Sequence, residues 1–152
     1  MRKTSSRTLA LAALDQWRGG KKFADVILGE LLRSSGFATA DRAFGTELFY
    51  GVLRNLTLLD FWIRQLRSGH VDQDSRDLIR LGFYQLFFLQ TPEHAAVFET
   101  VELASPRSRS LINAILRNAV RQKESLQALA NQQELSIRKS HPQFLIDRWQ
   151  QS

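Results

Sequence analysis

The strongest chemical signal in the sequence is a run of basic side chains near the middle of its second half. Five cations lie in it, and no aspartate or glutamate interrupts them: Arg107, Arg109, Arg117, Arg121 and Lys123. A helix would place Arg117 and Arg121 on one face, and a helix start near Arg107 and Arg109 would add backbone N–H groups that favour anions. Phosphate contacts dominate the affinity of proteins for nucleic acids, so this run predicts RNA contacts. A solvated helix face that keeps the protein soluble is the alternative.

A second basic segment lies at the N-terminus. Six basic residues stand against Asp15 alone: Arg2, Lys3, Arg7, Arg18, Lys21 and Lys22. Of these, Arg2, Lys3 and Arg7 form an arm that is a further candidate for RNA contact, and such arms usually add non-specific affinity. The whole chain of 152 residues has 21 Lys and Arg against 15 Asp and Glu, a formal net charge of +6. This balance favours a polyanionic partner.

Several kinds of chemistry lack the residues they need. The chain has no cysteine, which excludes a thiolate zinc site and a cysteine nucleophile. Its histidines, His70, His94 and His141, do not have the spacing of a helical metal site, so we expect no metal and no catalytic residue in this chain. The apolar run from Leu9 to Leu14 is too short for an export signal or a membrane span. We therefore expect a cytoplasmic protein without membrane contact.

Apolar residues recur at helical spacing along the chain, and strand signals are missing. The sequence therefore predicts an all-α fold, a compact bundle of about seven helices. The first expected helix follows Ser6 and ends at Gly19, and the second runs from Phe23 to Gly36. The third begins at Thr39, and the fourth contains Leu59 and Leu66. The last three span Ser75–Leu89, about Pro92–Ala104, and Ser108–Lys123. Asp74 with Asp77 resembles a capping box for the fifth helix. Gly82 within that apolar helix predicts a close helix crossing.

The chain after the bundle has a different composition. Residues 124–139 are rich in Gln and Asn with weak periodicity, which predicts a solvated connector that contributes little to stability, although its leucines could dock on the bundle. Ser140 and Pro142 then mark a new helix start. Its apolar side chains, expected at a domain interface, are Phe144, Leu145 and Trp149. We therefore predict a domain over 1–123, a connector over 124–139 and the start of a truncated following domain over 140–152.

Three stretches resemble one family: Asp41–Arg54, Leu78–Leu89 with Pro92 and His94–Ala104, and Leu111–Arg117. Together they resemble the NusB-like all-helical RNA-binding fold. They are most similar to the N-terminal domain of the Sun/Fmu (B-type) small-subunit rRNA cytosine-5 methyltransferases. The segment from Ser140 to Trp149 is similar to the one that leads into the catalytic part of those enzymes. Phe98 departs from the family pattern, which favours asparagine at this position.

The resemblance implies an RNA-binding domain that positions substrate for a SAM-dependent 16S rRNA (cytosine-5) methyltransferase. Its implied partners are ribosomal RNA and a catalytic methyltransferase domain in cis. S-adenosylmethionine and the catalytic cysteine would belong to that other domain, so we expect this chain alone not to be an enzyme. One alternative is a stand-alone NusB-type transcription antitermination factor, for which a ribosomal protein is a further candidate partner. Another alternative is a structural docking module that does not bind RNA.

Overall fold

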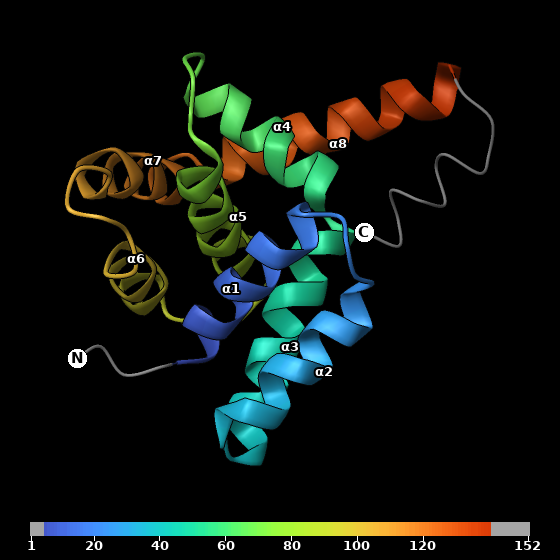
Figure 1. The fold of residues 1–152 in the computed structure, drawn as a ribbon. Coiled ribbons are helices and arrows are strands. Elements are labelled where there is room, and N and C mark those ends of the chain that lie inside the picture. The colour runs from blue at the N-terminus through green and yellow to red at the C-terminus, as the bar shows by residue number, and fades with distance from the viewer. Residues whose placement is uncertain (1–4, 141–152) are drawn as a thin grey trace.

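The computed structural model describes the backbone of residues 5–140 and the side chains of residues 5–134 (Figure 1). This part of the chain contains eight α-helices and no strand, which confirms the prediction of an all-α fold. The helices are α1 Ser6–Arg18, α2 Ala24–Ser35, α3 Thr39–Arg54, α4 Leu56–Leu66, α5 Gln73–Phe88, α6 Glu93–Val101, α7 Arg109–Arg121 and α8 Lys123–Ser140. None of them is long and apolar enough to cross a membrane.

Local signals set several of the helix ends. Ser5 caps α1 by accepting a hydrogen bond from the Thr8 amide at 3.1 Å, and α1 ends at Gly19 as predicted. α2 ends at Gly36, which has a φ of 69° in the left-handed region that favours glycine. The end of α6 differs from the prediction. It lies at Val101 rather than about Ala104, because the next residues form tight turns back to the helix.

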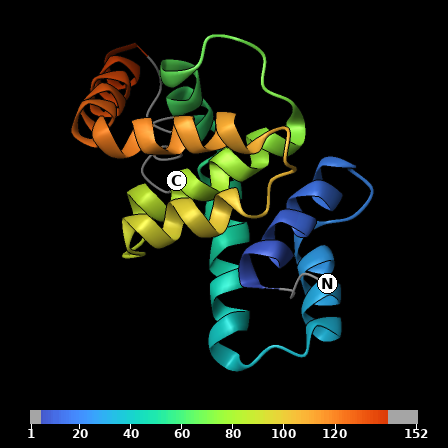
Figure 2. The same cartoon turned by 90° about the vertical axis from the view of Figure 1, so that its left-hand side faces the viewer.

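Helix α5 lies at the centre of the bundle, as its apolar sequence predicts. It packs against α1, α3, α4, α6 and α7 (Figures 1 and 2), and Leu81 and Phe83 are fully buried. The close crossing predicted at Gly82 is with α7. A Cβ atom on Gly82 would stand 2.5 Å from Leu116 Cδ2, so a larger residue would push α7 away.

The start of α5 corrects the predicted capping box. Asp72, not Asp74, is the N-cap, and its Oδ2 accepts a hydrogen bond from the Ser75 amide at 3.1 Å. The Ser75 side chain, followed by this backbone bond, lowers the pKa of Asp72. Asp77 caps nothing, because its carboxylate is buried against two arginines from the bundle.

Helix α8 occupies the segment that the sequence analysis expected to be a solvated connector. Leu126 is 1% exposed and belongs to the core. Its carbonyl accepts a 2.8 Å hydrogen bond from Trp62 Nε1 of α4. Leu126 and Ala130 are four residues apart, so both meet the bundle, and the Gln, Glu and Ala residues between apolar positions are good helix formers. The burial of Leu126 shows that the first turns of α8 are not a solvated connector, and their contribution to stability stays a prediction.

Candidate nucleic-acid interface

Helix α7 separates an apolar face from a polar one. Ile112, Ile115, Leu116 and Ala119 face the core. The opposite stripe is exposed and consists of Ser110, Ala114, Arg117 and Arg121. The spacing of four residues thus places both arginines on one solvent face, as predicted. Their contact with RNA stays a prediction.

The two arginines of this stripe have few internal contacts. Arg117 Nε donates a hydrogen bond to Asn113 Oδ1 at 3.2 Å, one turn earlier on the same helix. Among the described residues, no ion pair is recorded for Arg121 or for Arg107, which is also exposed in the turn before α7. All three guanidinium groups are therefore accessible to an anionic ligand.

The other two cations of the run make internal contacts. Arg109 is partly buried, and its guanidinium donates to the carbonyls of Ala104 and Glu102 at 3.2 and 3.3 Å. It thereby satisfies backbone acceptors beyond the end of α6. Lys123 Nζ lies 6.0 Å from the ring centroid of Phe87. The run of five cations is thus divided between an exposed face and internal packing, which the sequence alone did not distinguish.

Arg7 of the N-terminal arm also makes internal contacts. Its Nε donates to Gln85 Oε1 of α5 at 2.8 Å, and its guanidinium lies 5.2 Å from the Phe44 ring centroid. Burial lowers the pKa of Arg7, and the charge of Glu99 opposes this effect. The side chain ties α1 to α5 and α3, and its RNA contact stays a prediction. The other arm residues, Arg2 and Lys3, lie outside the described residues, as do Phe144, Leu145 and Trp149.

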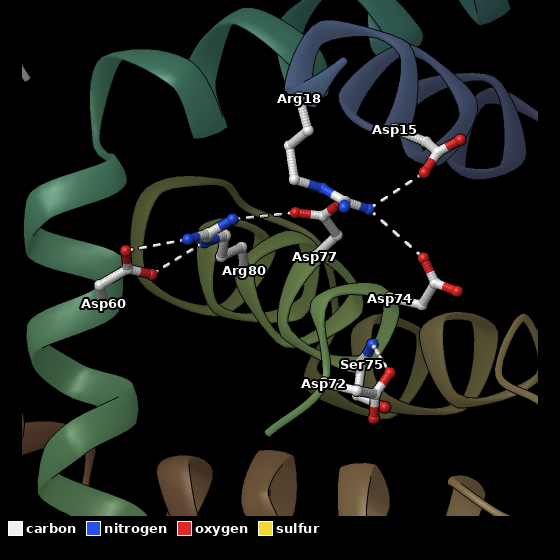
Figure 3. A network of polar contacts seen from close by, with 8 residues as sticks. All are labelled: Asp15, Arg18, Asp60, Asp72, Asp74, Ser75, Asp77 and Arg80. Carbon is white, nitrogen blue, oxygen red and sulfur yellow. Dashed lines mark hydrogen bonds and ion pairs between the residues drawn. The ribbon is translucent and has the colours of Figure 1, made fainter. Parts of the chain in front are cut away.

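A network of ion pairs joins α1, α4 and α5 (Figure 3). Asp77, whose side chain is 1% exposed, accepts from Arg18 Nε and Arg80 Nη1, each at 2.9 Å. Arg80 also makes a two-pronged pair with Asp60 at 2.8 and 2.9 Å. Arg18 additionally contacts Asp15 and Asp74 at 3.1 and 3.3 Å. Sequence reasoning grouped Arg18 with the basic N-terminal residues and took Asp77 for part of a capping box, so it missed the pairing of these two side chains.

Burial and charge oppose each other in this network. Burial raises the pKa of Asp77, and the two arginines partly offset that effect. For Arg80, burial opposes the charged form, but its bonds with Asp60 and Asp77 raise the pKa above its ordinary value. Each buried charge thus has an opposite charge within hydrogen-bonding distance. The network holds three helices together and does not offer Arg18 or Arg80 to an external anion.

Comparison with known proteins identifies the fold family. The model of the NusB family matches residues 4–121. The chain belongs to the NusB family. This match confirms the resemblance read from the sequence, and it ends with the last residue of α7. Helix α8 therefore follows the part of the chain that the NusB family model matches.

Other relatives of this NusB-family chain are similar over nearly all of it. It is 31% identical to "Probable ribosomal RNA small subunit methyltransferase B" of Bacillus subtilis over 98% of the chain and 35% of that relative. It is 36% identical to "Ribosomal RNA small subunit methyltransferase B" of Citrobacter koseri over 100% of the chain and 36% of that relative. The chain spans about a third of the length of these curated relatives.

Proposed function

We propose that this chain binds ribosomal RNA through the outer face of α7. In this proposal it is the N-terminal, substrate-positioning part of a SAM-dependent 16S rRNA (cytosine-5) methyltransferase. The supporting observation is the exposed stripe with Arg117 and Arg121, together with exposed Arg107, in a run without any carboxylate. Relatives named as small-subunit rRNA methyltransferases are similar to the chain along nearly its whole length.

The arrangement suits positioning rather than base recognition. Arginines on an exposed helix face contact phosphates of a folded RNA without reading its sequence. Holding the RNA in one orientation would let a catalytic domain in cis approach a single cytosine, which raises the effective concentration of the reacting groups. S-adenosylmethionine, bound by that other domain, would supply the methyl group. In this proposal the residues of the present chain bind and orient the RNA.

The salt dependence of RNA binding tests the proposal. Affinity for a fragment of small-subunit rRNA should fall steeply as salt rises, because bound phosphates release counterions. Changing Arg117 and Arg121 to glutamine should lower the slope of log affinity against log salt by about 1 for each phosphate that the variant no longer neutralises. Unrelated structured RNAs should lose affinity by similar factors, since phosphates carry no sequence information.

A matched control separates this face from general charge. Lys21→Gln with Arg33→Gln removes the same charge from exposed positions near and within α2, which lies across the bundle from α7 in both views (Figures 1 and 2). This control should leave the slope nearly unchanged. Equal slopes for the wild-type protein and the α7 double variant would refute RNA binding by the outer face of α7.

A further inference from the structure

A groove of about 330 Å³ lies between α4, the C-terminal end of α5 and α8. Helices α4 and α5 line it with apolar and aromatic side chains, those of Leu58, Trp62, Phe87 and Phe88. Helix α8 lines it with the side chains of Gln127 and Asn131. Its volume is near the lower end of the range for small-ligand sites, about 300 to 1,000 Å³, so it suits a single planar ring system.

Aromatic rings are concentrated in this groove. Trp62 and Phe87 stack with their ring centroids 4.2 Å apart. Phe88 stacks on Tyr84 at 5.2 Å, and 38% of its surface is still exposed. An exposed ring that neighbouring rings hold in place offers a face on which a planar ligand can stack.

Two amide side chains of α8 have unused hydrogen-bonding groups beside these rings. Gln127 and Asn131 are four residues apart on one helix face, and both are exposed. No hydrogen bond to another described residue is recorded for either side chain. Each amide offers donors and an acceptor, which matches the mixture of donors and acceptors on the edge of a nucleobase.

The groove is also connected to the proposed RNA face, because α7 leads directly into α8. Helix α7 ends at the exposed Arg121, and α8 begins at Lys123. Lys123 Nζ lies 6.0 Å from the ring centroid of Phe87, which lines the groove. Among the described residues of the lining, Glu134 is the only carboxylate, and it lies about 16 Å further along α8 than Lys123. The end of the groove nearest α7 is therefore the one that favours a phosphate.

We infer that this groove holds one unpaired base of the RNA that the outer face of α7 binds. The base stacks on Phe88, its edge forms hydrogen bonds with Gln127 and Asn131, and the adjoining phosphate lies near Lys123. This inference rests on the proposed function and deepens it, because phosphate contacts along α7 carry no sequence information whereas a bound base does. The two amides lie beyond the residues 4–121 that the NusB family model matches.

Binding of two matched RNA hairpins to the complete chain tests the inference. The first is a hairpin of small-subunit rRNA with an unpaired loop, and the second has the same sugar-phosphate backbone with abasic residues in the loop. Phe88→Ala should weaken binding of the first hairpin by about tenfold, because it removes a stacking face, and should leave binding of the second unchanged. Its salt dependence should stay that of the wild-type protein, because no phosphate contact is lost. Phe98→Ala is the control, at a ring on α6 that is 50% exposed and outside the groove, and should change either affinity by less than about twofold.

A second pair of variants leaves the aromatic packing intact. Gln127→Ala with Asn131→Ala should weaken binding of the first hairpin by about fivefold and leave the second unchanged, because two hydrogen bonds to the base are lost. Gln132→Ala with Gln133→Ala, at exposed positions of α8 outside the groove, should change neither affinity. Melting temperatures establish that each variant folds.

Several outcomes would overturn the inference. One is an equal loss of affinity for the two hairpins in the groove variants, and another is an equal loss in the control variants. Groove variants that bind both hairpins as tightly as the wild-type protein would also overturn it, as expected if a protein segment occupies the groove. Arg117→Gln with Arg121→Gln should weaken both hairpins alike and lower the salt slope, so a failure of the proposed function is distinguishable from a failure here. No binding of either hairpin by the wild-type protein would overturn both.

Discussion

At the scale of single residues, Asp77 is the centre of the ion network. It is almost fully buried and separates two guanidinium groups that would otherwise face each other. Asp77→Asn keeps the shape but removes the shared negative charge. We expect the free energy of unfolding, measured by urea denaturation, to fall by about 3 kcal/mol, as when one partner of a buried pair is removed. Asp74→Asn, at a side chain that is 83% exposed, should change it by less than about 0.5 kcal/mol. An equally small loss of unfolding free energy in Asp77→Asn and Asp74→Asn would show that the buried network adds no stability.

Tyr84 should make the stability of the bundle decrease at alkaline pH. Burial, followed by its hydrogen bond to Glu47, raises the pKa of Tyr84 to about 12. A tyrosine in the unfolded chain ionises near pH 10, whereas Tyr84 in the folded protein keeps its proton to a higher pH. The protonated Tyr84 therefore makes its full contribution to stability below about pH 10. Stability should then fall as pH rises from about 10 towards 12, and less so in Tyr84→Phe. Phenolate absorbance should show one tyrosine titrating late in the wild-type protein. A late titration that persists in Tyr84→Phe would contradict the assignment to Tyr84.

Single residues also show which parts of the candidate site could be predicted from the sequence. Helical spacing is a local property, so the shared exposed face of Arg117 and Arg121 could be predicted. Arg7 and Arg18 find their partners 78 and 59 residues away, in Gln85 and Asp77. Nothing in the local pattern separates such paired arginines from free ones. The candidate site could therefore be predicted as a helix face but not as a final set of cations.

At the scale of elements, α8 offers a matched pair of leucines. Leu126 is 1% exposed and lies in the core, whereas Leu129 on the same helix is 38% exposed. Leu126→Ala should lower the free energy of unfolding by about 2 to 5 kcal/mol, because it leaves a cavity in the core. Leu129→Ala should cost less than about 1 kcal/mol. Denaturant unfolding followed by circular dichroism measures both. Equal costs would mean that α8 does not pack on α4 as described.

The elements themselves were largely predictable, and the exceptions have physical reasons. Ser5, Gly19 and Gly36 act through their own backbone neighbours, so the ends they set could be read from the sequence. The first turns of α8 are held by the apolar contacts of Leu126 and Ala130 and by a bond from Trp62, which lies 64 residues from Leu126. The sequence indicated only that leucines of this segment could dock on the bundle, because a tertiary contact decides whether they do.

At the scale of the whole molecule, the proposal that another domain carries out the chemistry predicts that the isolated chain neither transfers methyl groups nor binds S-adenosylmethionine. Transfer of a methyl group to cytosine C5 in the family that the sequence resembles needs a cysteine and a site for S-adenosylmethionine, and this sequence has no cysteine. Incubation with labelled S-adenosylmethionine and small-subunit rRNA should therefore yield no methylated RNA, and calorimetry should detect no binding of the cofactor. The full-length Citrobacter koseri relative, named as a small-subunit rRNA methyltransferase, serves as the positive control. Saturable cofactor binding by this chain would contradict the assignment of the chemistry to another domain and would place a cofactor pocket within the helical bundle.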